Sequence, residues 1–211
     1  MSGLGTMMTG GKRTHKHAGA VLAGGAKTAK RQENDFYPTP ADCVTALLVA
    51  EAEPLTLHRT IWEPACGDGA ICHVLHQHGF TTVATDLIDR GHGKGGKNFL
   101  TEVEILAPAI ITNPPFCLAE EFVRHALDLG AEYVAMLLKS TWFHASSRYP
   151  LFLKHQPTAV YPLTWRPDFL GQGAPTMEAC WFVWDKSLAQ NICKYCPLPR
   201  PAGGLLDMME E

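Results

Sequence analysis

The sequence lacks several features that would assign it to a common class. No run of about 18 apolar residues is present, so no segment is long enough to span a membrane. The N-terminal stretch has no apolar core of the kind found in secretory signal peptides. The phosphate-loop motif GxxxxGK[ST] and the dinucleotide fingerprint GxGxxG are also missing. We therefore expect a soluble, cytoplasmic protein with no membrane partner. We expect neither a phosphate loop nor a dinucleotide-binding turn in it.

Cysteine is present, but without the pattern of a disulfide framework or a zinc finger. The chain has seven cysteines, an odd number, spread over strand-like and helix-like segments. Cys193 and Cys196 form a CxxC pair, yet no second pair stands at finger spacing. On a helix, His73 and His76 would share a face with no evident third ligand. We expect reduced thiols and no metal site.

Charge is placed unevenly along the chain. The formal net charge is −3, but residues 1–34 carry +5, from six basic side chains and one acidic one, which leaves −8 for residues 35–211. Residues 1–34 also hold few large apolar side chains to bury, so we expect a disordered basic tail. Residues 35–200 are expected to form one domain, and residues 201–211 a loose end.

From residue 35 onward, strand patterns and helix patterns alternate. Runs at 70–79 and 119–130 carry apolar residues at helical spacing. Six short apolar runs have the length and composition of strands: 60–65, 81–87, 109–113, 133–139, 158–164 and 179–185. This alternation predicts an α/β fold with a mostly parallel sheet and helices on both faces.

Unusual residues follow these strands directly. EPACGDG, residues 63–69, comes after the first strand, and Asp86 ends the second. Ligands of open α/β sheets bind at the carboxyl ends of the strands, so one crevice should hold these segments. Gly67 and Gly69 allow close approach of a ligand to the backbone, and the acidic residues among them disfavour a pyrophosphate. Because Asp86 can accept two ribose hydroxyls, a nucleoside with a positively charged group fits best.

NPPF, residues 113–116, ends a later strand in the same manner. Pro114 and Pro115 hold the backbone extended, so that the Asn113 side-chain oxygen and the Pro114 carbonyl can aim at one point. An exocyclic amine satisfies both acceptors, and its lone pair is then free to attack a methyl group. Phe116 offers a face for a base, which in duplex DNA must first leave the stack. A rigid turn without chemistry is the structural alternative.

EPACGDGAI, TDL and NPPF, in this order, resemble the class I S-adenosylmethionine-dependent methyltransferases. In particular they are similar to the N6-adenine DNA methyltransferases, whose corresponding motif reads [DNS]PP[YFW]. DFYPTP, residues 35–40, resembles the segment that closes over the methionine end of the cofactor in that family. The motif order matches the gamma arrangement, and residues 137–152 and 161–173 resemble segments of phage-type members.

The resemblance covers about residues 35–185. It implies a Rossmann-like class I methyltransferase fold with an antiparallel final strand, S-adenosyl-L-methionine as cofactor, and methyl transfer to N6 of adenine in DNA. The cofactor-binding residues that it implies are Tyr37, Thr39, Pro40, Glu63, Pro64, Ala65, Gly67, Asp68, Gly69, Asp86, Leu87, Asn98 and Phe99. The catalytic residues that it implies are Asn113, Pro114, Pro115 and Phe116, and the substrate-binding residues are Trp142, Arg148 and Arg166.

Several alternatives stay open at this point. Asn98 stands where many relatives have an acid, and Arg148 and Arg166 have purely structural interpretations. The same NPPF site could methylate RNA adenine or a protein glutamine amide, or the chain could be a non-catalytic binding module. Few residues follow the last strand, so we expect sequence specificity to come from loops such as 141–150 and 165–178, or from a partner protein.

Overall fold

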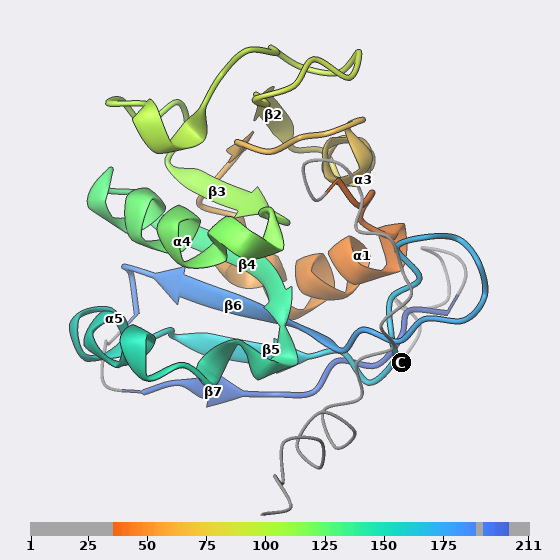
Figure 1. Ribbon diagram of the computed structural model, residues 1–211, viewed down its shortest axis with the longest axis vertical. Coiled ribbons are helices and arrows are strands. Elements are labelled where there is room, and N and C mark those ends of the chain that lie inside the picture. Colours follow the sequence, from red (N-terminus) through yellow and green to blue (C-terminus); the bar gives the residue numbers. More distant parts are fainter. Residues whose placement is uncertain (1–35, 189–191, 203–211) are drawn as a thin grey trace, which may run out of the picture. The chain divides into compact units, whose positions relative to one another are not determined.

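The sheet of this protein has seven strands in the order β2-β1-β3-β4-β6-β5-β7, in a computed structural model that describes residues 36–188 and 192–202 (Figure 1). All of these residues belong to one compact unit of the chain, Gln32–Glu211. The expected basic tail, residues 1–34, and residues 203–211 of the expected loose end lie outside the described residues.

The strands confirm the expected mostly parallel sheet. Their bounds are β1 Thr60–Glu63, β2 Thr81–Ala84, β3 Ala109–Thr112, β4 Tyr133–Lys139, β5 Ala159–Pro162, β6 Ala179–Asp185 and β7 Lys194–Tyr195. The first four pair in parallel with their neighbours, whereas β6 lies between β4 and β5 and runs antiparallel to both. β7, a short strand that was not predicted, pairs in parallel with β5.

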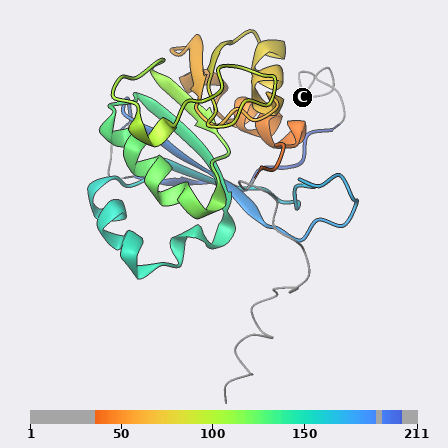
Figure 2. The same ribbon diagram turned by 45° about the horizontal axis from the view of Figure 1, so that its top comes forward.

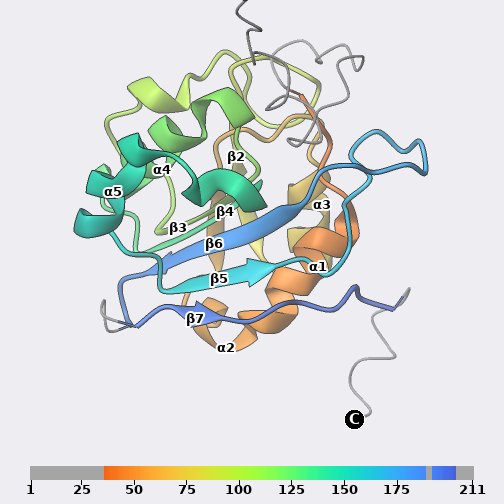
Figure 3. The same ribbon diagram turned by 60° about the horizontal axis from the view of Figure 1, so that its bottom comes forward.

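Helices cover both faces of the sheet. Their bounds are α1 Ala41–Ala50, α2 Ala52–Leu55, α3 Ala70–Gln77, α4 Ala119–Asp128 and α5 Tyr149–Lys154. Side chains of α1 and α3 join one buried cluster against the sheet, and side chains of α4 and α5 join a second cluster on the other face. Figures 2 and 3 show these two helical layers. The class of fold is therefore the Rossmann-like one that the sequence predicts.

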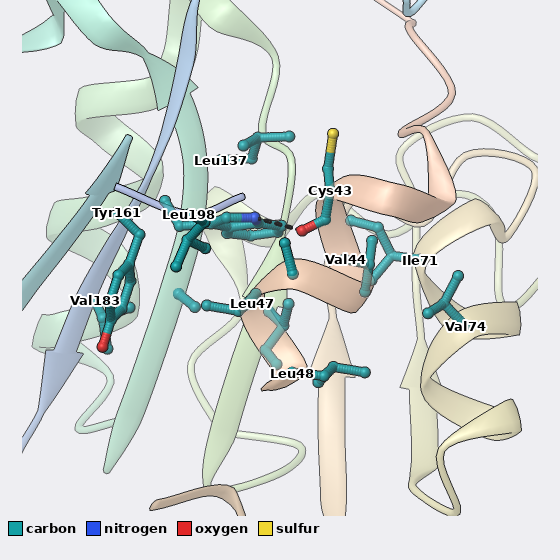
Figure 4. Close-up of a cluster of buried hydrophobic side chains, with 14 of the residues drawn as sticks. Cys43, Val44, Leu47, Leu48, Ile71, Val74, Leu137, Tyr161, Val183 and Leu198 are labelled. Carbon is teal, nitrogen blue, oxygen red and sulfur yellow. Dashed lines mark hydrogen bonds between the residues drawn. The ribbon is translucent and has the colours of Figure 1, made fainter. Parts of the chain in front are cut away.

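The first cluster fixes α1 to the middle of the sheet. Val44 and Leu47 of α1 are fully buried beside Ile71 of α3, as Figure 4 shows. The indole Nε1 of Trp181, on β6, donates a hydrogen bond of 2.8 Å to the Cys43 carbonyl of α1. Because α1 begins at residue 41, this anchor also fixes the position of the segment 36–40 that leads into it.

The short strand β7 separates its two flanking cysteines. Cys193 packs against the cluster on the α4 side, and Cys196 packs against the cluster on the α1 side, so they lie on opposite faces. Within the part of the chain that the structure describes, no group of three or more His, Cys, Asp or Glu side chains is placed to hold a metal ion. No helix among those residues is both long and apolar enough to cross a bilayer.

Candidate active site

The turn after β1 is tied to the end of β2 by one carboxylate. Asp86 accepts a hydrogen bond of 2.8 Å from the Gly67 N–H through Oδ2, and another of 2.8 Å from the Ile88 N–H through Oδ1. The bond from Gly67 draws the two strand ends together, as expected for neighbouring parallel strands, whereas the bond from Ile88 closes a local turn after Asp86. Each carboxylate oxygen keeps a further lone pair, so Asp86 can still accept hydroxyl donors from a ligand.

The glycines of this turn are enclosed by two rings. Gly67 and Gly69 have φ angles of 55° and 87°, in the left-handed region that favours glycine. A Cβ at Gly67 would lie 2.5 Å from the Phe36 ring, and a Cβ at Gly69 would lie 2.5 Å from the His92 ring. Only glycine fits at either position, because a side chain there would collide with these rings.

Acidic side chains gather at this turn without basic partners. Glu63, at the end of β1, is 2% exposed and accepts a hydrogen bond from the Cys72 thiol. Burial raises the pKa of Glu63 well above its usual value, and the charges of Asp86 and Asp68 raise it further. Among the described residues, no lysine or arginine forms an ion pair with these three acids. Since burial favours the neutral form of Glu63, the carboxylates of Asp68 and Asp86 are the groups of this turn that favour a ligand with positive charge.

The Asn113 side chain presents a free acceptor. Its Nδ2 donates hydrogen bonds to Thr39 Oγ1 at 3.1 Å and to the Tyr37 carbonyl at 3.4 Å. Its Oδ1 is buried and has no partner in the described part of the chain. No hydrogen bond to the Pro114 carbonyl is found there either. An unpaired buried acceptor costs about 1–3 kcal/mol, so a ligand with an N–H donor would relieve this cost.

Two aromatic rings and one cation lie around Phe116 of the NPPF turn. The Phe116 ring lies 5.8 Å from Tyr37 and 6.3 Å from Phe169, measured between ring centroids. The ammonium group of Lys139, at the end of β4, lies 5.1 Å from the Phe116 ring centroid. Lys139 is exposed and forms no ion pair with any described residue. The geometry suits a flat ligand that carries a negative charge beside its aromatic part.

Phe169 and Lys139 are residues that the sequence did not reveal. Phe169 lies in the long loop between β5 and β6, which extends away from the end of the sheet (Figures 1 and 2, blue). Asp168 organises this loop by accepting hydrogen bonds from the Gln172 and Gly173 N–H groups, which also lower the pKa of Asp168. Both residues lie in segments, 137–152 and 161–173, that resemble segments of phage-type members, but the resemblance assigned no role to either residue. Lys139 also stands at the end of a strand.

The remaining residues assigned to the cofactor divide into two groups. Pro40 precedes α1, Pro64 and Ala65 lie in the turn after β1, and Leu87 is exposed at the end of β2, all beside the site. By contrast, the Asn98 side chain accepts a hydrogen bond from the Leu100 N–H and caps the short 3-10 helix Phe99–Thr101.

Phe99 is part of the core. It is 2% exposed and packs against the rings of Trp62 and Phe122. The structure thus gives both Asn98 and Phe99 a structural role.

The three residues assigned to substrate also make structural contacts. Trp142 is 5% exposed and packs against Phe182 in the core. Arg148 pairs with Glu120 at 3.3 Å, and Arg166 pairs with Glu178 at 2.7 Å. Within the described part of the chain, none of the contacts found for these three residues reaches residues 113–116.

Comparison with known proteins supports the fold through structure alone. The sequence matches no protein family, and no curated protein is significantly similar to it. A protein described as a class I S-adenosylmethionine-dependent methyltransferase, from Listeria monocytogenes, is 14% identical with a TM-score of 0.58, and the alignment covers 85% of this chain and 71% of that chain.

Two further solved structures are similar. An RNA methyltransferase, so described, from Pyrococcus horikoshii has a TM-score of 0.61 at 12% identity, with 81% of this chain and 97% of that chain covered. A modification subunit described as part of a type I restriction enzyme from Vibrio vulnificus has a TM-score of 0.56 at 15% identity. That alignment covers 80% of this chain but only 48% of the subunit. At these identities the likeness establishes the class I methyltransferase fold.

Proposed function

We propose that this protein is an S-adenosyl-L-methionine-dependent methyltransferase that transfers a methyl group to the exocyclic N6 of adenine in DNA. One observation carries the proposal: Asn113 Oδ1 is buried and unpaired while its Nδ2 is held by Thr39 and Tyr37. An acceptor held in this way suits an amine that brings its own N–H donors.

The residues of the glycine turn fit the cofactor. Asp68 and Asp86 have no basic partner among the described residues, which suits a ligand with a sulfonium and an ammonium group, and the buried Glu63 can offer a hydrogen bond beside them. The spare lone pairs of Asp86 suit two ribose hydroxyls. When bound, the cofactor supplies an electrophilic methyl group.

The NPPF turn would orient the attacking nitrogen. Asn113 Oδ1 and the Pro114 carbonyl accept the two N–H groups of the amine, which leaves the nitrogen lone pair free to face the methyl group. During transfer the nitrogen–methyl bond would form as the methyl–sulfur bond of the cofactor breaks, and positive charge would develop on the nitrogen. The two oxygens stabilise this charge until the nitrogen releases one proton to water. Loss of one such preorganised partner typically lowers kcat by about 10²–10³-fold.

The surroundings of Phe116 favour a nucleotide over a protein glutamine. An adenine ring can stack on Phe116, an interaction worth about 1–3 kcal/mol, whereas a glutamine amide offers a much smaller face. Lys139 lies over the same ring with its charge uncompensated by any described acid, which suits a backbone phosphate.

The test is transfer of labelled methyl from S-adenosyl-L-methionine to unmethylated DNA, RNA and protein. We expect label in DNA as N6-methyladenine, reduced by about 10²–10³-fold in Asn113→Ala. Label only in RNA or only in protein would show that RNA or protein, and not DNA, is the substrate. If no pool is labelled although the cofactor binds, the protein is a non-catalytic binding module or needs a partner protein for activity.

A second experiment tests the phosphate contact. Lys139→Gln should weaken DNA binding and reduce the salt dependence of log Kd by about one unit of slope. Lys154→Gln removes the same charge from α5, where the lysine side chain is 67% exposed and pairs with Asp128. This control should leave the slope unchanged. Equal slopes for wild type and Lys139→Gln would remove Lys139 from the substrate site.

A further inference from the structure

Thr39 lies in a place that its family resemblance does not explain. By resemblance, the segment 35–40 contacts the cofactor. In the structure, however, the Thr39 side chain contacts the catalytic turn, because Thr39 Oγ1 accepts a hydrogen bond of 3.1 Å from Asn113 Nδ2. Thr39 is 7% exposed, so this contact is shielded from water.

We infer that Thr39 is a positioning residue whose hydroxyl holds the Asn113 amide with its oxygen toward the substrate amine. The inference rests on the proposed function, in which Asn113 Oδ1 is the acceptor. It assigns to Thr39 a role in methyl transfer that is separate from cofactor binding.

The orientation of this amide decides whether the site can work. The oxygen and the NH₂ group of an asparagine side chain have nearly the same shape, so packing alone selects weakly between two orientations that differ by 180°. In the reversed orientation, the NH₂ group would face the N–H donors of the amine, and no hydrogen bond could form. The Tyr37 carbonyl can only accept, so it favours the NH₂ group on its side.

The Tyr37 contact alone is weak, because its length is 3.4 Å. The shorter bond to Thr39 takes the second N–H of the amide, so that the NH₂ group is fully satisfied only in the productive orientation. Without the Thr39 hydroxyl, one N–H would face an apolar group and the amide would be held by one long bond. The acceptor oxygen would then spend less time in line with the substrate.

The backbone around Thr39 is built to keep this hydroxyl in place. Pro40 follows directly and restricts Thr39 to extended conformations. α1 begins at the next residue and is anchored to β6 through the hydrogen bond from Trp181 to the Cys43 carbonyl. The Thr39 hydroxyl is therefore a fixed partner for Asn113.

Three variants separate this role from cofactor binding. Thr39→Val removes the hydroxyl at nearly constant volume, and Thr39→Ser keeps it. The control is Thr112→Val, because Thr112 lies beside Asn113 on β3, is fully buried, and has a hydroxyl without a partner among the described residues. Measurements are kcat at saturating cofactor and DNA, and the Kd of the cofactor by calorimetry.

We expect Thr39→Val to lower kcat by about tenfold or more while the cofactor Kd changes by less than about threefold. Thr39→Ser should restore most of kcat, and Thr112→Val should match wild type. A raised cofactor Kd with unchanged kcat in Thr39→Val would overturn the inference, since Thr39 would then be a cofactor contact. Unchanged kcat and unchanged Kd would overturn it as well.

A spectroscopic measurement tests the hydrogen bond without activity. The sequence contains four asparagines, Asn34, Asn98, Asn113 and Asn191, so labelling their side-chain amides with ¹⁵N gives few signals. The Asn113 signals are those lost in Asn113→Ala. Their exchange with water should be faster in Thr39→Val than in wild type and Thr39→Ser.

The two proposals fail in different ways. A wild-type protein that methylates no substrate would refute the proposed function, yet the amide signals would still decide whether Thr39 holds Asn113. Identical exchange in wild type and Thr39→Val would refute the positioning role even in an active enzyme.

Discussion

The glycine turn after β1 can be tested by one substitution with an internal control. Gly69 and Gly79 flank the same helix, α3, with φ angles of 87° and 82°. A Cβ at Gly79 would meet nothing within 4 Å, whereas a Cβ at Gly69 would lie 2.5 Å from the His92 ring. Alanine at the two positions therefore causes the same backbone strain and differs in one collision.

The magnitudes follow from these distances. Placing alanine in the left-handed region costs about 1–2 kcal/mol, which is the whole effect expected for Gly79→Ala. The collision of Gly69→Ala adds about 1–3 kcal/mol, a typical cost of forcing extra atoms into a packed site. Gly69→Ala should thus lower the free energy of unfolding about twice as far. It should also weaken cofactor binding, which Gly79→Ala should not change.

Urea denaturation of four variants gives the answer. Besides the two single variants, His92→Ala and the double variant Gly69→Ala/His92→Ala complete a mutant cycle. With the ring removed, the alanine at position 69 should cost no more than the alanine at position 79. Equal losses for the two single variants, or no recovery in the double variant, would refute the idea that His92 encloses this turn.

Three further predictions concern the acids and the core. Because burial raises the pKa of Glu63 above the 4.5 of a free glutamate, folding favours its protonated form, and this contribution is lost as pH rises above 4.5. Glu63→Gln should remove that loss, so urea denaturation between about pH 5 and about pH 8 should show a flatter pH profile. Asp86 accepts backbone hydrogen bonds from Gly67 and Ile88, and Asp86→Asn has only one acceptor oxygen, so it can keep only one of them. Calorimetry should show the cofactor affinity reduced by about tenfold. Trp181→Phe loses the bond to the Cys43 carbonyl and part of a buried ring, which should lower the free energy of unfolding by about 1–3 kcal/mol in urea titrations.

Much of the fold could be predicted because buried strands have a plain signal. β4 was predicted with the bounds it has, since every residue of Tyr133–Leu138 is buried and apolar. α1 could also have been found, because Cys43, Val44, Leu47 and Leu48 have the spacing of a buried helix face. β7 could not, because two exposed residues paired at the edge of a sheet carry no periodicity.

The site was predictable where its residues follow strands in motifs. The segments around Gly67, Asp86 and Asn113 were expected at one edge of the sheet, and the structure joins the first two by a hydrogen bond and the third to Thr39. Phe169 is brought to Phe116 by a loop in which the sequence resemblance assigned no role to that residue.

Aromatic residues near motifs are harder to assign. Phe99 and Trp142 were predicted to contact ligands because of their neighbours in the sequence, and in the structure both also pack in the core, so their contact with a ligand stays a prediction. Burial of a large aromatic ring stabilises the folded state. The position of such a ring near a motif in the sequence does not reveal whether it packs in the core or contacts a ligand.

The position of β6 between β4 and β5 has a consequence for synthesis of the protein. While the ribosome is making the chain, the apolar strand β4 is complete before its second neighbour, β6, which ends only at Asp185. During that time one edge of β4 is open. An open, apolar edge strand is prone to pair with other chains. The nascent protein must therefore keep the open edge of a four-stranded part of the sheet from aggregating for more than 40 residues of elongation, from Lys139 to Asp185. We expect chaperones that bind extended apolar segments to protect this edge strand during that part of synthesis.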